Sequence, residues 1–167
     1  MSRPLALLIL LSLVAPSLPA AAAGQKPGQW LVTSRMTMKG IPEEQLAQMR
    51  KMGMGGIFSG EPRTTKQCVT PEQAAKGIDF DQGRNGCQYA NKVVTATRVS
   101  ADVVCPGPRL KGKGHIDMTL SGDSAYSGRW SLDGVDRAGN KLQQEIQFDG
   151  KWDKASCDAD ALGGKPR

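Results

Sequence analysis

The feature that most constrains the fold is a series of short segments in which apolar and polar residues alternate. In residues 141–148 (KLQQEIQF), for example, Leu142, Ile146 and Phe148 alternate with charged and amide side chains. A period of two places the apolar side chains on one face of a β-strand. We therefore predict an all-β fold, an antiparallel curved sheet or small barrel of about six to eight strands. The other predicted strands are residues 28–40, 63–69, 87–94, 98–105, 109–120 and 125–132.

Two segments carry helix signals instead. In IPEEQLAQMRKMG, residues 41–53, Pro42 suits the first helical position, and acidic residues follow it while basic residues come last. In TPEQAAKG, residues 70–77, Thr70 suits an N-cap, with a glutamine three residues later and a terminal glycine. We therefore expect two short helices within the β-rich fold. DGVDRAGN, residues 133–140, is predicted to be a turn.

The N-terminus reads as a secretory signal peptide. MSRPLALLILLSLVAPSLPAAAA, residues 1–23, combines Arg3, an 11-residue apolar run and alanines at the predicted cleavage site. That run is shorter than the roughly 20 residues that span a bilayer, and no later segment is apolar enough. We expect residues 1–23 to be the signal peptide and residues 24–167 to form a single exported β-rich domain without a transmembrane span.

The four cysteines, Cys68, Cys87, Cys105 and Cys157, all follow this leader. None belongs to a Cys-x-x-Cys pair, which disfavours a redox motif or a structural zinc site. An even number in an exported chain favours disulfides. A hairpin turn centred on Ala96 would set Cys87 opposite Cys105. The predicted disulfides are therefore Cys87–Cys105 and Cys68–Cys157.

The charge is mildly basic, with a formal net charge of +6 at pH 7 for the full sequence. Because the basic residues are scattered and the chain is expected to be exported, we do not expect nucleic acid as a partner. One stripe stands out, because four basic residues occupy alternate positions of one predicted strand. They are Arg109, Lys111, Lys113 and His115. The stripe is either a ledge that meets an anionic envelope surface or, as we prefer, an edge strand protected by lysines.

The residues that carry common catalytic chemistry are sparse. His115 is the single histidine, and no serine or cysteine stands beside a second partner that would complete a hydrolytic triad. DGVDRAGN resembles a calcium loop only loosely, because Gln144 stands where the EF-hand pattern needs glutamate. We therefore predict no enzyme, no catalytic residues, no cofactor and no bound metal as the leading interpretation.

Five of the seven methionines lie between residues 36 and 54. Ordinary packing accounts for all of them but Met54, which lies in a glycine-rich loop. A second reading is a pliable apolar binding surface, and a third is Cu(I) binding through Met49, Met52 and Met54. We predict non-catalytic binding of an apolar or amphipathic ligand, with copper(I) binding or a purely structural or interaction role as alternatives. The predicted ligand-binding residues are Trp30, Met36, Met38, Met49 and Met52.

Several short motifs occur in a fixed order along nearly the whole mature chain: GQW, GIP, CVTPEQA, GCQY followed by VVC, YSGRW, and DGKW followed by a cysteine. Together they resemble an exported bacterial family known as domain of unknown function 3617. The resemblance implies a periplasmic location in a Gram-negative bacterium. It implies no activity and supplies no binding residues.

Overall fold

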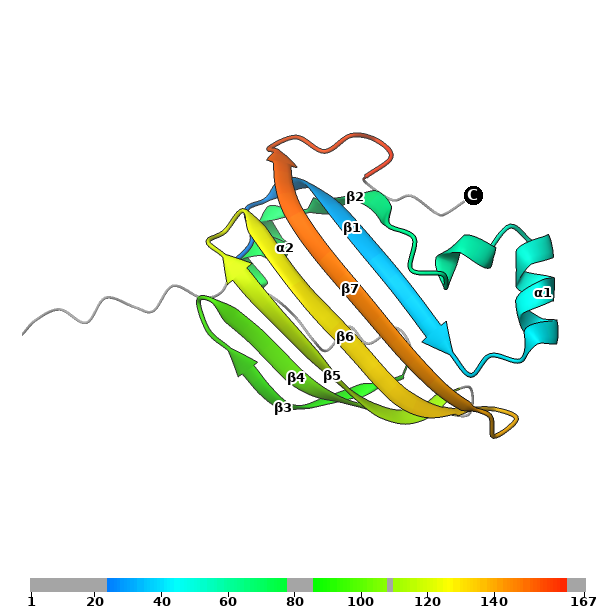
Figure 1. The fold of residues 1–167 in the computed structure, drawn as a ribbon. Helices are drawn as coiled ribbons and strands as arrows, with labels where there is room; N and C mark the ends of the chain where they lie inside the picture. Colours follow the sequence, from blue (N-terminus) through cyan, green and yellow to red (C-terminus); the bar gives the residue numbers. More distant parts are fainter. Residues whose placement is uncertain (1–23, 78–85, 108–109, 162–167) are drawn as a thin grey trace, which may run out of the picture.

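The structure is a computed structural model that describes residues 24–77, 86–107 and 110–161. The predicted signal peptide lies outside these residues. Seven strands form one antiparallel sheet in the order β2-β1-β7-β6-β5-β4-β3 (Figure 1). The predicted all-β antiparallel fold is thus confirmed as an open sheet. The strands are β1 (Gly28–Lys39), β2 (Arg63–Val69), β3 (Gln88–Val94), β4 (Arg98–Pro106), β5 (Leu110–Ser121), β6 (Ala125–Asp136) and β7 (Lys141–Lys154).

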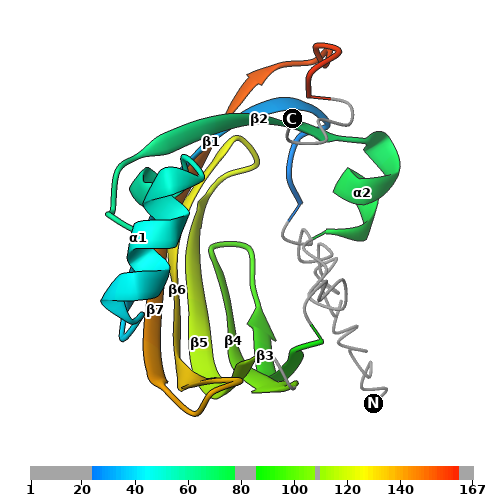
Figure 2. The same ribbon diagram turned by 90° about the vertical axis from the view of Figure 1, so that its right-hand side faces the viewer.

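The sheet is strongly curved and resembles a half-barrel when viewed from the side (Figure 2). Glycines in β5 allow part of this curvature. A Cβ atom on Gly112 would lie 2.5 Å from the Asp133 carbonyl oxygen, and one on Gly114 would lie 2.0 Å from that of Ser131. Only glycine tolerates such close approach of a neighbouring strand, and glycines are a recognised means of bending a sheet. The alternation of glycine with lysine in β5 therefore serves the bend.

The hydrophobic core lies on the concave face. Two buried clusters comprise Val99, Ala101 and Leu120, and Val103, Cys105 and Leu132. Trp30 is 1% exposed, and its ring stacks on Tyr126 with 5.5 Å between the ring centroids. Full burial of a large apolar side chain contributes about 1.5–3 kcal/mol. The apolar half of each alternating strand is what holds the fold together.

Both predicted helices are present, as α1 (Glu43–Lys51) and α2 (Pro71–Lys76). In α2 the Thr70 hydroxyl accepts from the Gln73 backbone N–H at 3.2 Å, and the Thr70 N–H donates to the Gln73 side chain at 2.9 Å. The predicted N-cap is therefore confirmed. Pro42 is the N-cap of α1 rather than its first helical residue, because its ψ of 140° is extended. A 3-10 turn, η1 (Gly55–Ile57), follows α1.

The segment DGVDRAGN was predicted to be a turn, and half of this prediction is wrong. Asp133 and Val135 pair with Gln143 and Lys141 of β7, so β6 continues to Asp136. Only residues 137–140 make the turn. The Asp136 carboxylate accepts from the backbone N–H groups of Ala138 and Asn140, each at 2.8 Å. The Asn140 side chain and these N–H groups hold the pKa of Asp136 below its usual range.

Both predicted disulfides are confirmed. The Cα atoms are 4.1 Å apart in Cys87–Cys105 and 5.7 Å apart in Cys68–Cys157. The register of the β3–β4 hairpin shifts between Ala90 and Val93, where Asn91 has a φ of 50°. The turn is centred between Ala96 and Thr97 rather than on Ala96, because Val94 pairs with Val99. The irregularity shifts the register by one residue, so that at the strand ends Cys87 lies opposite Cys105.

Candidate functional site

The concave face carries an unbroken row of apolar side chains that crosses the sheet. Met36 in β1 is paired with Ile146 in β7, Ile146 with Trp130 in β6, Trp130 with Ile116 in β5, and Ile116 with Ala101 in β4. Directly paired residues have neighbouring side chains on the same face of a sheet. Ala101 is fully buried, whereas the other four are only half-buried. The row therefore presents apolar surface that the described residues do not cover completely.

One end of the concave face is closed by aromatic rings. Tyr126 stacks on Trp30 and meets Phe148 edge-on. The ring centroids of Tyr126 and Phe148 are 6.2 Å apart. The Tyr126 ring lies over Gly150, where an added Cβ would come within 2.2 Å of it. Burial, with a smaller contribution from the negative charge of Asp149, raises the pKa of Tyr126 to about 12. This phenol therefore stays neutral, and the cluster forms a packed wall.

The structure brings only some of the predicted ligand-binding residues together. Met36 and Met38 are half-buried on the concave face, and the Met36 sulfur accepts from the Gln144 amide at 3.4 Å. Trp30 shares this face but is fully buried in the aromatic wall. In α1, Met49 is half-buried, and Met52, the C-cap residue of this helix, is 63% exposed. The concave face thus gathers the predicted residues of β1 and leaves Met52 in solvent.

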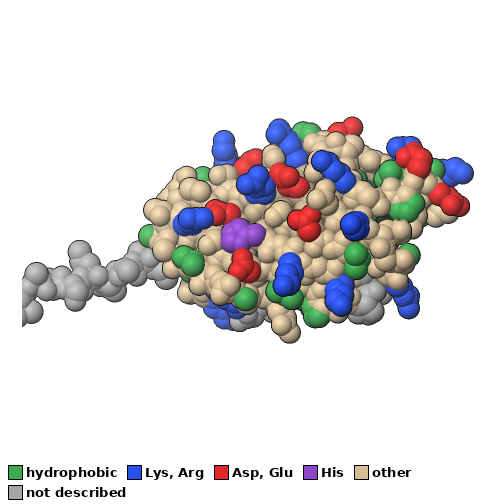
Figure 3. All heavy atoms as spheres, turned by 60° about the horizontal axis from the view of Figure 1, so that its bottom comes forward, with side chains coloured by type: hydrophobic (Ala, Val, Ile, Leu, Met, Phe, Trp, Pro, Cys, Tyr) green, Lys and Arg blue, Asp and Glu red, His purple; other side chains and the backbone are tan. Residues whose placement is uncertain are grey.

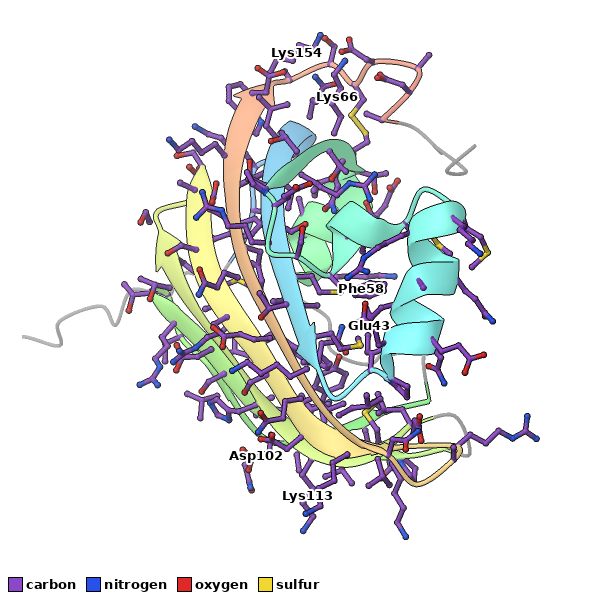
Figure 4. The ribbon with its side chains drawn as sticks, turned by 45° about the vertical axis from the view of Figure 1, so that its right-hand side comes forward. Glu43, Phe58, Lys66, Asp102, Lys113 and Lys154 are labelled. Atoms are coloured by element: carbon purple, nitrogen blue, oxygen red, sulfur yellow. A yellow bond between two sulfur atoms is a disulfide. The ribbon has the colours of Figure 1, made fainter. Side chains whose placement is uncertain are left out.

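Helix α1 lies beside the end of β1 and has no fully buried residue. Its main packing partner is η1, which in turn contacts β1. Figure 4 places Phe58, the residue after η1, between β1 and α1. The backbone N–H of Gly60 donates to the Met36 carbonyl at 2.9 Å, which ties this segment to β1. Of the three methionines considered for copper, Met49 and Met54 are linked by a backbone hydrogen bond of 2.9 Å.

Sequence reasoning missed Ile116, Trp130 and Ile146 as members of the candidate site. Their alternation with polar residues did predict that each would face the core side of its own strand. What the pattern does not contain is the pairing of β1 with β7 across more than 100 residues, which brings Met36 beside Ile146.

The predicted basic stripe lies on the convex face. Its interpretation as a protected edge strand is wrong, because β5 pairs with β4 on one side and β6 on the other. Lys111, Lys113 and His115 are exposed there, and Arg109 lies outside the described residues. Figure 3 shows the single histidine among interspersed basic and acidic side chains.

His115 does not act together with the lysines of the stripe. Its Nδ1 lies 2.9 Å from a carboxylate oxygen of Asp102, and the Asn91 amide donates to the other oxygen at 2.6 Å. Asn91 and, second, His115 hold the pKa of Asp102 below its usual range. The stripe is therefore divided between a hydrogen-bonded histidine and two lysines that form no ion pair with the residues described.

With this geometry in place, comparison with known proteins gives a single finding. The family described as "Protein of unknown function (DUF3617)" matches residues 25–157. The chain belongs to this family. The matched DUF3617 region runs from just before β1 to Cys157, so it includes the whole concave face and both disulfides. No curated protein and no solved structure matches the chain.

A polar cluster just after the DUF3617 region forms a clasp on the C-terminal segment, to which Lys66 and Lys154 contribute (Figure 4). Asp158 accepts from Lys154 at 2.5 Å and from Lys66 at 2.9 Å, and its backbone N–H donates to Gln29 at 2.8 Å. These lysines hold the pKa of Asp158 far below its usual range. Because the clasp adjoins the Cys68–Cys157 disulfide and Gln29 is fully buried, we interpret it as structural.

The described part of the chain holds no group of three or more histidine, cysteine, aspartate or glutamate side chains arranged to bind a metal ion. None of its helices has the length and apolar character needed to cross a membrane.

Proposed function

We propose that this chain is an exported protein of the cell envelope that binds an apolar or amphipathic molecule on its concave face and catalyses no reaction. The observation that carries the proposal is the row formed by Met36, Ile146, Trp130 and Ile116, all half-buried and adjacent across four strands. An extended apolar ligand laid across the strands would cover all four side chains at once.

The energetic argument rests on surface that folding leaves partly uncovered. Neither α1 nor α2 contains a fully buried residue, so within the described residues neither helix packs tightly onto this row. Removing an apolar side chain from water contributes about 25 cal/mol per Å² of buried area. Ser34 also lies on this face, two residues before Met36 in β1. Gln144 of β7 lies there too, opposite Met38 in the neighbouring cross-strand pair. They offer hydrogen bonds to the polar end of an amphipathic ligand.

The proposed location rests on other features. Disulfides persist in oxidising compartments, and this chain carries two, one of which ties β2 to the C-terminal segment. The leader-like residues 1–23 and the resemblance to an exported family point the same way. We therefore propose the periplasm of a Gram-negative bacterium as the place of function.

Titration of the purified protein with a fluorescent long-chain fatty acid tests the binding proposal. We expect saturable binding that Ile146→Ser weakens by about tenfold or more, because a polar group interrupts the row. The matched control is Gln147→Ser, which changes the next residue of β7 on the convex face. Since Ile146→Ser also lowers stability, Met36→Gln at the end of the row provides a second variant. Equal affinity for the wild type, both row variants and the control would overturn the proposal.

Native mass spectrometry of the protein isolated from its own host, without reductant, tests the ligand and the location together. We expect a chain without residues 1–23, a mass deficit of two disulfides and an adduct of an apolar molecule. Bound copper in place of that adduct would favour the copper(I) alternative through Met49, Met52 and Met54. An intact leader or free thiols would overturn the proposed location.

A further inference from the structure

The convex face contains a depression of about 790 Å³ that sequence reasoning did not detect. It lies where β1 ends, β7 begins, β6 ends and β5 begins. Four lysines from three strands line it, and all four are exposed: Lys39, Lys111, Lys113 and Lys141. Val135, Leu142 and glycine backbone contribute its apolar part. Figure 4 shows Lys113 pointing away from the sheet on this outer side.

The charges of this lysine depression are largely uncompensated. None of the four lysines forms an ion pair with any residue that the structure describes. The lining contains one carboxylate, that of Asp133, which accepts a hydrogen bond from the Gln143 amide at 2.9 Å. Asp133 lies opposite Lys113 in the register of β5 and β6. On the same face, two arginines do lie in ion pairs, Arg98 with Asp117 and Arg129 with Glu145. The depression is therefore a concentrated positive site.

We propose that the lysine depression docks onto the phosphate groups of an anionic lipid surface. A phosphate could also come from a small molecule, but the donors present favour a surface. The depression lies on paired strands, so its hydrogen-bond donors are mainly flexible lysine ammonium groups, which act as point charges. A single free anion would be held weakly by such groups. A lipid surface presents several phosphates together, and each lysine near it adds about fivefold in affinity.

This inference is independent of the ligand proposed for the concave face. It depends on Lys39 and Lys141, which are about 100 residues apart in sequence, meeting the stripe lysines of β5. If both proposals hold, the apolar face and the docking face are opposite sides of the same strands.

Co-sedimentation with vesicles tests the docking site. We expect the protein to bind vesicles of phosphatidylcholine mixed with phosphatidylglycerol and not vesicles of phosphatidylcholine alone. The double variant Lys111→Gln/Lys113→Gln should lose about 25-fold in affinity, and Lys39→Gln/Lys141→Gln a similar factor. The matched control, Lys51→Gln/Lys151→Gln, removes the same charge outside the depression and should lose less than about twofold. Asp133→Asn, which removes the one carboxylate of the lining, should tighten binding.

Three outcomes would overturn the proposal: no binding to the anionic vesicles, equal losses in the depression and control variants, or release by inorganic phosphate at an ionic strength where chloride has no effect. The last outcome would identify a site for free phosphate. Fatty-acid titration of Lys111→Gln/Lys113→Gln separates the two proposals, because its affinity on the concave face should be unchanged.

Discussion

The two faces of the sheet are made by neighbouring residues of the same strands, yet different forces act on them. Ile146 and Trp130 are half-buried on the concave face, whereas their chain neighbours Gln147 and Arg129 are exposed on the convex face. Burial of apolar surface stabilises the fold and is not electrostatically screened by salt, while exposed ion pairs contribute about 0–1 kcal/mol and are screened. We infer that the concave face carries the stability and that the convex face is free to carry charge for recognition.

The disulfides follow the same division. Cys105 belongs to a buried cluster of the concave face. Cys68 of β2 lies opposite Gln29 of β1 in the strand register. Because Gln29 precedes Trp30 in an alternating strand, it faces the convex side, where the Asp158 clasp lies. The Cys87–Cys105 disulfide therefore reinforces a short hairpin on the apolar face, and the Cys68–Cys157 disulfide joins distant segments beside a polar cluster.

Removal of the Cys68–Cys157 disulfide should give the largest effect. With a sequence separation of 89, loss of Cys68–Cys157 should lower the free energy of unfolding by about 4.6 kcal/mol in the chain-entropy model. Loss of Cys87–Cys105, with a separation of 18, should cost about 3.2 kcal/mol. Urea denaturation of the two double alanine variants measures both. A larger cost for Cys87–Cys105 would mean that burial on the concave face outweighs loop length.

A pair of alanine substitutions in β1 compares the faces directly. Trp30→Ala removes a fully buried ring that stacks on Tyr126 and whose indole N–H donates to the Lys26 carbonyl at 2.9 Å. We expect a loss of about 4 kcal/mol. Leu31→Ala, at a residue 37% exposed on the opposite face, should cost less than about 1 kcal/mol. Chemical denaturation measures both, and similar losses would contradict the assignment of the core to the concave face.

The clasp predicts a smaller, pH-dependent effect. Because the folded-state pKa of Asp158 is depressed, its contribution to stability is present above the ordinary aspartate pKa of about 4 and is lost as pH falls toward the folded-state value. Asp158→Asn should therefore lower Tm at neutral pH, and the difference from wild type should shrink in acid. Thermal unfolding across a pH series measures this, with Asp149→Asn as control. A difference that is constant with pH would argue against the ion pairs.

Several features were predictable from sequence because they depend on residues close together in the chain. Thr70 and Gln73 cap α2 through contacts three residues apart, and the β3–β4 hairpin sets Cys87 opposite Cys105. The alternating pattern likewise predicted strands close to their observed positions. Strand length was less predictable: β6 extends past Asp133, because pairing with β7 continues there despite two glycines and two aspartates in eight residues.

The sequence by itself determined the strands, the two short helices and the Cys87–Cys105 pairing, since alternation, capping and hairpin register are local; Cys68–Cys157 followed only as the remaining pair. Only the tertiary structure decided that β7 lies between β1 and β6, that β5 is an interior strand, and that Met36 joins Ile146 while Met52 does not. It also brought Lys39 and Lys141 to the stripe lysines. The physical reason is that an alternating strand specifies which of its faces is apolar but not which strand lies beside it. That choice is made when distant segments bury their apolar faces together.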